Sequence, residues 1–172
     1  PVAAYSIINN VGWADKIVNN TYAEFEILPG LKARSSMGID LAFWGSDGLT
    51  PSHYLNATNL LDTNNVYSSF NRGFTWIWDN TLTYSHSVGK HNLNYLLGHS
   101  AQEVNGRYIG GNKRDVPTQD FQDATIDYGR NEISEQVYGG RWERYAIESY
   151  FGRVNYDYDG KYVATAILRG DA

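Results

Sequence analysis

The chain contains no cysteine in its 172 residues, which excludes disulfide frameworks, thiol catalysis and zinc–thiolate sites. It also has no apolar run of about 18 residues, the length that a transmembrane helix requires. Strands remain a way across a membrane, because the signal of a barrel strand is an alternation that is weak in each segment. The formal net charge is -5, without a basic stripe, so nucleic acid is not an expected partner.

Aromatic residues are plentiful. They make up 15% of the chain, with 14 Tyr and 5 Trp, which is typical of sheets, interfaces and ligand-binding surfaces. The hydrophobic fraction is 42% and the mean hydropathy is -0.48, so the bulk composition resembles that of a soluble protein. The length suits one ordinary domain.

Three tight-turn signals separate alternating runs: Pro29-Gly30, Gly89-Lys90 and Asp159-Gly160. They predict six strands, at 16–28, 31–43, 73–86, 91–103, 145–158 and 161–170. The remaining connections, at 44–72 and 104–144, are long. An up-and-down meander then has its tight turns at one end and its long loops at the other, which is the rule in outer-membrane barrels. The long connections are therefore predicted to be external loops.

The predicted strands alternate between an apolar and a polar face. In 31–43, for example, Leu31 and Ala33 share one side, whereas Lys32 and Arg34 share the other. A soluble antiparallel sheet with one dry face fits this pattern as well. In a barrel the polar side would face the lumen, and we assign to it Lys32, Arg34, Asp40, Asp79, Arg153, Asp157 and Arg169.

The positions of the aromatic residues favour the membrane. They cluster at both ends of the predicted strands, while the middles carry Ala, Val, Leu, Ile and Met, as expected at two membrane interfaces. We assign to a lipid-facing girdle Trp76, Trp78, Tyr84, Tyr95, Tyr156, Tyr158 and Tyr162. The predicted fold is an all-β, antiparallel up-and-down meander of about six strands, part of a large transmembrane β-barrel. The alternatives are a soluble, secreted carbohydrate-binding β-sandwich and, more weakly, a glycosidase built on one.

Catalysis and metal binding find little support. The four histidines, His53, His86, His91 and His99, form no chelating pair. Glu24 and Glu26 share a strand face but lack a nucleophile or a second catalytic element. The second loop is acidic (Asp115, Asp120, Asp123, Asp127, Glu132 and Glu135) without calcium-loop spacing, and basic residues offset most of that charge. We expect no enzymatic activity, no metal and no cofactor.

The first long loop combines amides with aromatic rings, which suits neutral ligands such as oligosaccharides or peptides. An exposed, turn-rich loop explains the same composition equally well. The candidate ligand-binding residues are Trp44, Tyr54, Asn56, Tyr67 and Trp142.

Four segments together carry a resemblance to a known family: "NNTYAEFEILPGLKARSSMGID" (19–40), "WDNTLTYSHSVGKHNL" (78–93), "KHNLNYLLGHSAQ" (90–102) and "SYFGRVNYDYDGKYVATAILRGDA" (149–172). In order and spacing they resemble the SusC/RagA family of TonB-dependent outer-membrane transporters. The two long loops match nothing comparable. One departure is that Gly170 follows Arg169 where family members commonly have a second arginine.

The resemblance implies an outer-membrane importer of nutrients, either glycans or oligopeptides, with a barrel of about 22 strands and a plugged lumen. It also implies a TonB-contacting segment, a SusD-like surface lipoprotein as lid, and contact with outer-membrane lipid. Residues 1–172 are expected to be a mid-barrel section, without the plug, the TonB box or the C-terminal strand. The start at Pro1 and the end after a strand-like run agree with a piece of a longer protein.

Overall fold

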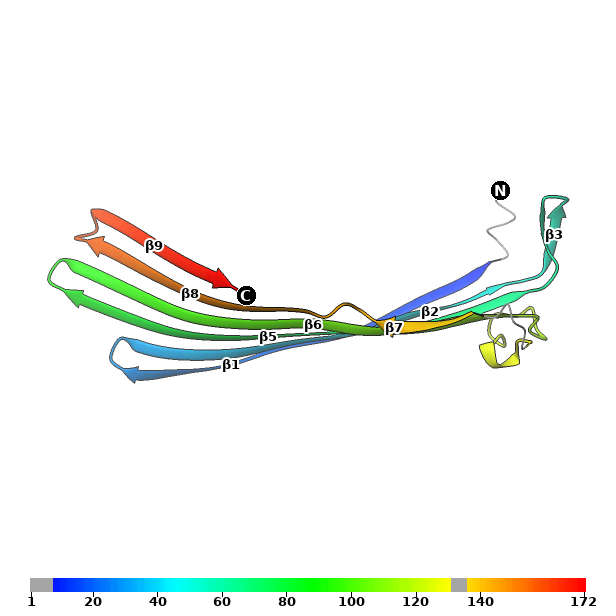
Figure 1. The fold of residues 1–172 in the computed structure, drawn as a ribbon, viewed down its shortest axis with the longest axis horizontal. Helices are drawn as coiled ribbons and strands as arrows, with labels where there is room; N and C mark the ends of the chain where they lie inside the picture. The colour runs from blue at the N-terminus through cyan, green and yellow to red at the C-terminus, as the bar shows by residue number, and fades with distance from the viewer. Residues whose placement is uncertain (1–7, 131–135) are drawn as a thin grey trace. The chain divides into compact units, whose positions relative to one another are not determined.

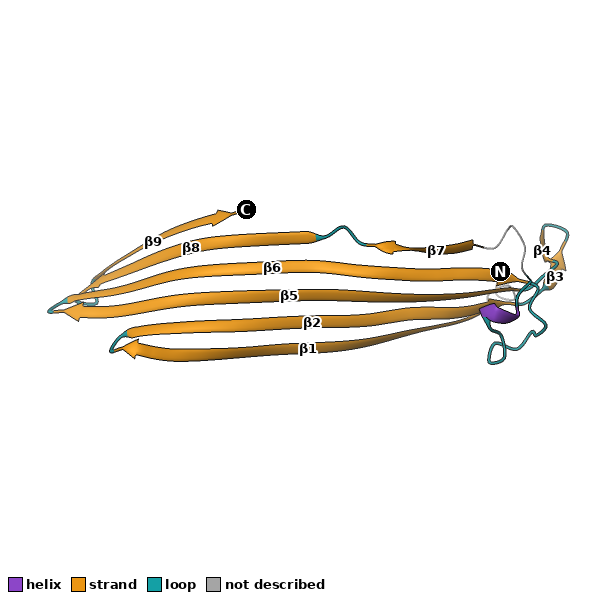
Figure 2. Cartoon of the chain, turned by 60° about the horizontal axis from the view of Figure 1, so that its bottom comes forward, coloured by secondary structure: helices purple, strands orange, loops and turns teal. Residues whose placement is uncertain are grey.

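A computed structural model describes residues 8–130 and 136–172, and strands dominate them (Figure 2). The strands are β1 (Asn9–Leu28), β2 (Leu31–Thr50), β3 (His53–Asn56), β4 (Asn59–Leu61), β5 (Asn65–Val88), β6 (His91–Arg114), β7 (Gln136–Arg141), β8 (Tyr145–Tyr158) and β9 (Tyr162–Asp171). One short 3-10 helix, η1 (Ile126–Tyr128), lies between β6 and β7. No helix among these residues is long and apolar enough to cross a membrane.

The strands follow one another in the sheet in nearly the order of the chain. The main path is β1-β2-β5-β6-β8-β9, β7 pairs with β6, and β3 and β4 form a separate two-stranded sheet. The pairings of β6 with β7 and β8, and of β8 with β9, are antiparallel. The predicted all-β antiparallel meander is confirmed.

The described residues fall into two compact units. Unit 1 contains 8–16, 42–73, 106–130 and 136–143, and unit 2 contains 17–41, 74–105 and 144–172. The three hairpin turns belong to unit 2, where Figure 1 shows them side by side. Both long connections belong to unit 1.

Each of the three predicted turns is present, and each uses a left-handed backbone conformation. Gly30, Gly89 and Gly160 have φ values of 83°, 60° and 68°. Asp159, directly before Gly160, has φ 55°, a value that Asp adopts more readily than most residues. Glycine takes such angles without steric cost, and the three turns lie at the residues that the sequence predicts.

The turns are joined laterally by main-chain hydrogen bonds. Ser85 N–H donates to the carbonyl of Gly30 (2.8 Å), and Asp159 N–H donates to that of Lys90 (2.9 Å). The first turn therefore lies beside Ser85, four residues before Gly89, whereas the third lies level with the second. Figure 2 shows the same offset between the β1–β2 and β5–β6 turns.

Four strands extend further than predicted: β1 begins at Asn9, β2 continues to Thr50, β5 begins at Asn65 and β6 continues to Arg114. The strands predicted at 16–28, 31–43, 73–86 and 91–103 were therefore too short. The additional strand residues lack an apolar-to-polar alternation and include several glycines, so periodicity could not reveal them. Main-chain pairing, as between β6 and β7, forms the sheet there instead.

Unit 1 has a small core beneath its loops. Leu49, Val66 and Val116 are buried, and Phe121 packs against them. Asn64, 3% exposed, clamps the second loop: its amide donates to the carbonyls of Val116 (2.9 Å) and Thr118 (2.7 Å), and its side-chain oxygen accepts from Val116 N–H (2.8 Å).

Replacing Asn64 by Ala should loosen this loop locally. The change leaves buried main-chain groups of Val116 without their partner, at a cost of about 1–3 kcal/mol. We expect faster amide hydrogen exchange at Val116 while β8 and β9 keep their protection. Asn56→Ala is the matched control, because Asn56 accepts hydrogen bonds only locally, from Thr58. Unchanged exchange at Val116 in Asn64→Ala would contradict this role.

Candidate functional site

The register of β6, β8 and β9 separates two faces of unit 2. Asn92 pairs with Asp157 and Leu93 with Tyr156, so near the turn successive side chains of β6 have a polar and then an aromatic neighbour on opposite faces. Tyr156 in turn pairs with Ala164. We call the side of Asp157 the polar face and the side of Tyr156 the aromatic face.

Side-chain hydrogen bonds connect neighbouring strands across the polar face. Their pairs are Asp79 with Ser100, Ser85 with Asn94, Asn92 with Asp157, Asn155 with Thr165, and Ser149 with Arg169. At the β1–β2 edge, the Arg34 guanidinium lies 4.1 Å from the centre of the Tyr22 ring and 3.9 Å from a Glu24 carboxylate oxygen. Many polar groups of this face thus bond to one another between strands.

Three of the seven residues assigned to the lumen line one shallow pocket on this face. Arg34, Asp79 and Arg169 surround about 430 Å³ together with Ser100 and Phe151. Asp157 lies on the same face and accepts a hydrogen bond from Asn92 (3.1 Å).

The other three lumen-assigned residues lie outside this pocket. Strand alternation places Lys32 and Asp40 on the Arg34 side of β2, and Arg153 on the Asp157 side of β8. Arg153 stands between Leu96 and Ile167, so the polar face also carries apolar side chains.

A row of tyrosines follows the turns on the aromatic face. Tyr84 stacks near Tyr95 (6.4 Å between ring centres), and Tyr158 lies 6.5 Å from Tyr162. His91, not assigned to the girdle from the sequence, lies 5.0 Å from the Tyr158 ring, and its Nδ1 is 2.7 Å from the Tyr156 hydroxyl.

A second row crosses the same face further along the strands. The Trp78 ring lies edge-on to His99 (6.0 Å), and His99 lies against Tyr150 (4.9 Å). Trp78 Nε1 donates to Ser35 (3.0 Å), and His99 contacts Glu148 (3.0 Å). Trp76 and Trp78 were assigned to the girdle from the sequence, whereas Tyr150 and His99 were not. The signal was available, because Tyr150 shares a strand face with Gly152, and His99 with Leu97.

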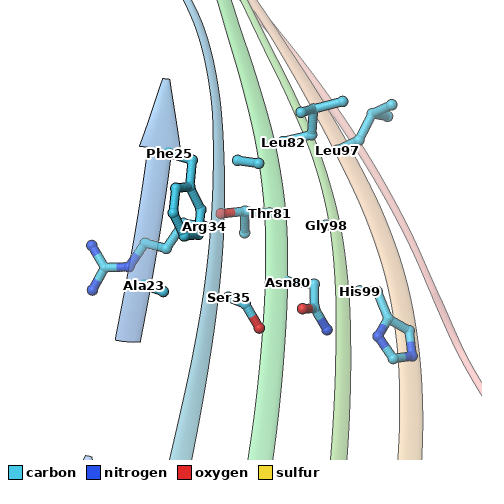
Figure 3. Close-up of a pocket in the computed structure, with 11 residues that line it drawn as sticks. Ala23, Phe25, Arg34, Ser35, Asn80, Thr81, Leu82, Leu97, Gly98 and His99 are labelled. Atoms are coloured by element: carbon cyan, nitrogen blue, oxygen red, sulfur yellow. The ribbon is translucent and has the colours of Figure 1, made fainter. Parts of the chain in front are cut away.

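Figure 3 shows the transition from this second row to the aliphatic band. Ser35, Asn80 and His99 lie at one level, and Phe25, Leu82 and Leu97 lie at the next, around a pocket of about 410 Å³. The aliphatic side chains of this band are not covered by other residues. The exposed fraction is 63% for Leu97 and 80% for Leu168.

In unit 1, two of the five candidate ligand-binding residues come together. The Trp44 and Trp142 rings lie 5.3 Å apart at 37°. Both rings cover Gly73, and a Cβ on Gly106 would lie 2.3 Å from Cε3 of Trp142. Glycines on β5 and β6 therefore form the floor on which this tryptophan pair rests.

The other three candidates lie elsewhere in unit 1. The Tyr67 ring covers Gly48 and lines a separate pocket with Phe121 and Asp127. Tyr54 is 73% exposed on the β3–β4 hairpin, where the Asn56 side chain is occupied by Thr58. The structure thus assembles part of the predicted set.

Among the described residues, no group of three or more His, Asp or Glu side chains is arranged to hold a metal ion. Of the acidic loop, Asp115 forms an ion pair with Arg130. Glu132 and Glu135 lie outside the described residues.

Comparison with known proteins agrees with the resemblance of the strand segments. TonB-dependent receptor P3 of Formosa agariphila is 29% identical over an alignment that covers 92% of this chain. The structure of the RagAB peptide transporter matches 96% of the chain with a TM-score of 0.83 at 20% identity. The chain is thus similar in sequence to a TonB-dependent receptor and in fold to RagAB, which agrees with the predicted resemblance to the SusC/RagA family.

The chain corresponds to only part of those proteins. It spans 15% of the receptor and 18% of the RagAB chain. Structures of the RagAB peptide importer in the "closed-closed" and "open-open" states both match with a TM-score of 0.84 at 21% identity. No family model matches the chain.

The glycine floor gives a direct test of the tryptophan pair. Gly106→Ala should push the Trp142 ring away from Trp44, because the new methyl group would overlap the ring. We expect a loss of the coupled near-ultraviolet circular dichroism of the two indoles. Gly170→Ala, where a Cβ meets no atom within 4 Å, should leave the spectrum unchanged. An unaltered spectrum in Gly106→Ala would refute the packing.

Proposed function

We propose that this chain forms a section of the barrel wall of a TonB-dependent outer-membrane importer of nutrients. The observation that carries the proposal is the contrast between the two faces of unit 2. One face carries aliphatic side chains between two aromatic rows, and the other carries polar groups bonded to one another.

The bare aliphatic band supports a membrane environment. Leaving residues such as Leu97 and Leu168 in water forgoes roughly 25 cal/mol for each Å² of apolar surface that could be buried. A soluble carbohydrate-binding β-sandwich would cover this band with a second sheet. Among the described residues the other sheet is the small β3–β4 hairpin, which belongs to unit 1.

The two aromatic rows then take the positions of interfacial girdles. Tyrosine and tryptophan favour the headgroup level because their rings are apolar and their O–H and N–H groups are polar. The tyrosine row would mark the periplasmic side, where outer-membrane barrels have short turns, and the Trp78 row the external side. Outer-membrane lipid would contact the band between them.

The polar face would line the lumen. Arg34, Asp79 and Arg169 would hydrate the bore and contact a plug domain of the parent protein. A wall needs no covalent chemistry, so the energy for transport would come from TonB through the plug. The equal similarity to the closed and open RagAB states supports a wall that keeps its shape during the cycle.

The cargo would be an oligopeptide or a glycan, taken up with a SusD-like surface lipoprotein as lid. Solved structures of a peptide importer share the fold of this chain, which favours a peptide. The tryptophan pair offers two aromatic faces, which would stack on a sugar ring as readily as on an apolar side chain. We therefore assign Trp44 and Trp142 to cargo contact.

The face assignment predicts unequal costs for two adjacent substitutions. Ala164→Arg should destabilise the folded barrel by about 2–4 kcal/mol, because it places a charge in the hydrocarbon layer. Thr165→Arg should be mild, since Thr165 lies on the polar face beside Asn155. The measurement is reversible unfolding of the full-length protein in lipid vesicles. An equal loss of unfolding free energy in the two variants would contradict the face assignment.

The tryptophan pair predicts a defect in uptake. Trp44→Ala with Trp142→Ala in the full-length importer should weaken growth on the cargo while the protein's level in the outer membrane stays normal. Tyr128→Ala removes an exposed aromatic ring of the same unit outside the pair and is the control. Unimpaired growth of the double variant would remove the pair from the cargo path.

A further inference from the structure

Three arginines of unit 1 gather on neighbouring strands. Arg107 of β6 and Arg141 of β7 are direct partners in the antiparallel register. Arg72 of β5 lines the same shallow pocket, which has a volume of about 520 Å³. We call these residues the arginine triad.

The arginine triad brings three positive charges together, and the residues around it do not neutralise them. Like charges directly opposite each other on paired strands destabilise a sheet. The residues that line this pocket include no acidic side chain, and all three arginines are exposed. Within the described residues no ion pair or hydrogen bond involves their side chains, whereas Arg130 pairs with Asp115 and Arg144 with Glu103.

Apolar side chains border the triad. Phe70 and Ile109 line the pocket and are 45% and 57% exposed. The Trp13 ring lies 5.7 Å from that of Phe70 and extends the apolar border toward β1. A ligand of this pocket would therefore meet positive charge and apolar surface together.

The triad and the tryptophan pair occupy opposite faces of unit 1. Arg107 follows Gly106, the floor of the pair, and Arg141 precedes Trp142, so strand alternation turns them to opposite sides. If the tryptophan pair faces the cargo path, the triad faces outward from the wall. In the sequence, Arg72 lies four residues before Trp76, one of the residues assigned to the lipid-facing girdle.

We propose that the arginine triad binds the phosphate-bearing headgroup of a membrane lipid. Guanidinium groups match phosphate with paired N–H donors, and three of them offset the charge of a phosphomonoester. The apolar border favours an amphiphile over free phosphate, because the apolar part of an amphiphile would cover Phe70 and Ile109. The assignment of a lipid source rests on the proposed membrane function, whereas the anion site rests on the triad alone.

The test uses the intact importer in detergent micelles, with phosphatidic acid as the probe and phosphatidylcholine as the neutral comparison. Native mass spectrometry measures the lipid retained by each variant. Arg107→Gln with Arg141→Gln should weaken phosphatidic acid binding by about tenfold or more, because the double variant loses two guanidinium groups that would donate charge-assisted hydrogen bonds to the phosphate. Arg72→Gln probes the same pocket from β5, in case the double variant does not fold.

Arg130→Gln is the matched control, because it removes an exposed arginine of the same unit that already has a carboxylate partner. It should leave binding unchanged. Equal retention of phosphatidic acid by the wild type, the double variant and Arg72→Gln would overturn the site. Full competition by inorganic phosphate would overturn the lipid source. Uptake of cargo by the double variant should be normal, so a failure of the lipid site is distinguishable from a failure of the import function.

Discussion

Main-chain pairing with β6 is the constraint on which most of the structure depends. The first part of this strand pairs with β8 from His91 to Val104, and a later part pairs with β7 from Arg107 to Asn112. Because the pleat has a period of two, each register determines which side chains of the neighbouring strand share a face. A slip of one residue between β6 and β8 would move Asp157 to the aromatic face and Tyr156 to the polar face, and would separate Asn92 from its partner.

The strands of unit 2 could be predicted from the sequence because two independent signals agree there. Residues such as Pro29, Gly89 and Asp159 mark the turns, and the alternation between them defines the faces. The register follows from the turns, so the polar partners across β8 and β9 follow as well. The tyrosines beside the turns were assigned to a girdle for the same reason. The pocket shared by Arg34, Asp79 and Arg169 could not be predicted from the sequence, because it depends on how three hairpins align laterally.

Unit 1 was predicted less well, for a physical reason. Its strands place bulky side chains over glycines: Trp142 covers Gly106, and Tyr67 covers Gly48. This packing breaks the alternation of apolar and polar residues on which a sequence-based assignment relies. The extension of β6 to Arg114 and the meeting of Trp44 with Trp142 depend on pairings between residues far apart in the chain, and no local pattern reports those.

The hydrogen bond from Ser85 to Gly30 has a consequence for the direction of the strands. It sets the first turn back by four residues from the second, a distance of about 13 Å at a rise of roughly 3.3 Å per residue. In a barrel, such stagger accumulates around the circumference as shear, and the total shear fixes the tilt of the strands and the width of the bore. The level alignment of Asp159 with Lys90 adds nothing to it. Within these three hairpins, the stagger between turns thus arises between β2 and β5, where the Gly30 carbonyl accepts from Ser85 N–H.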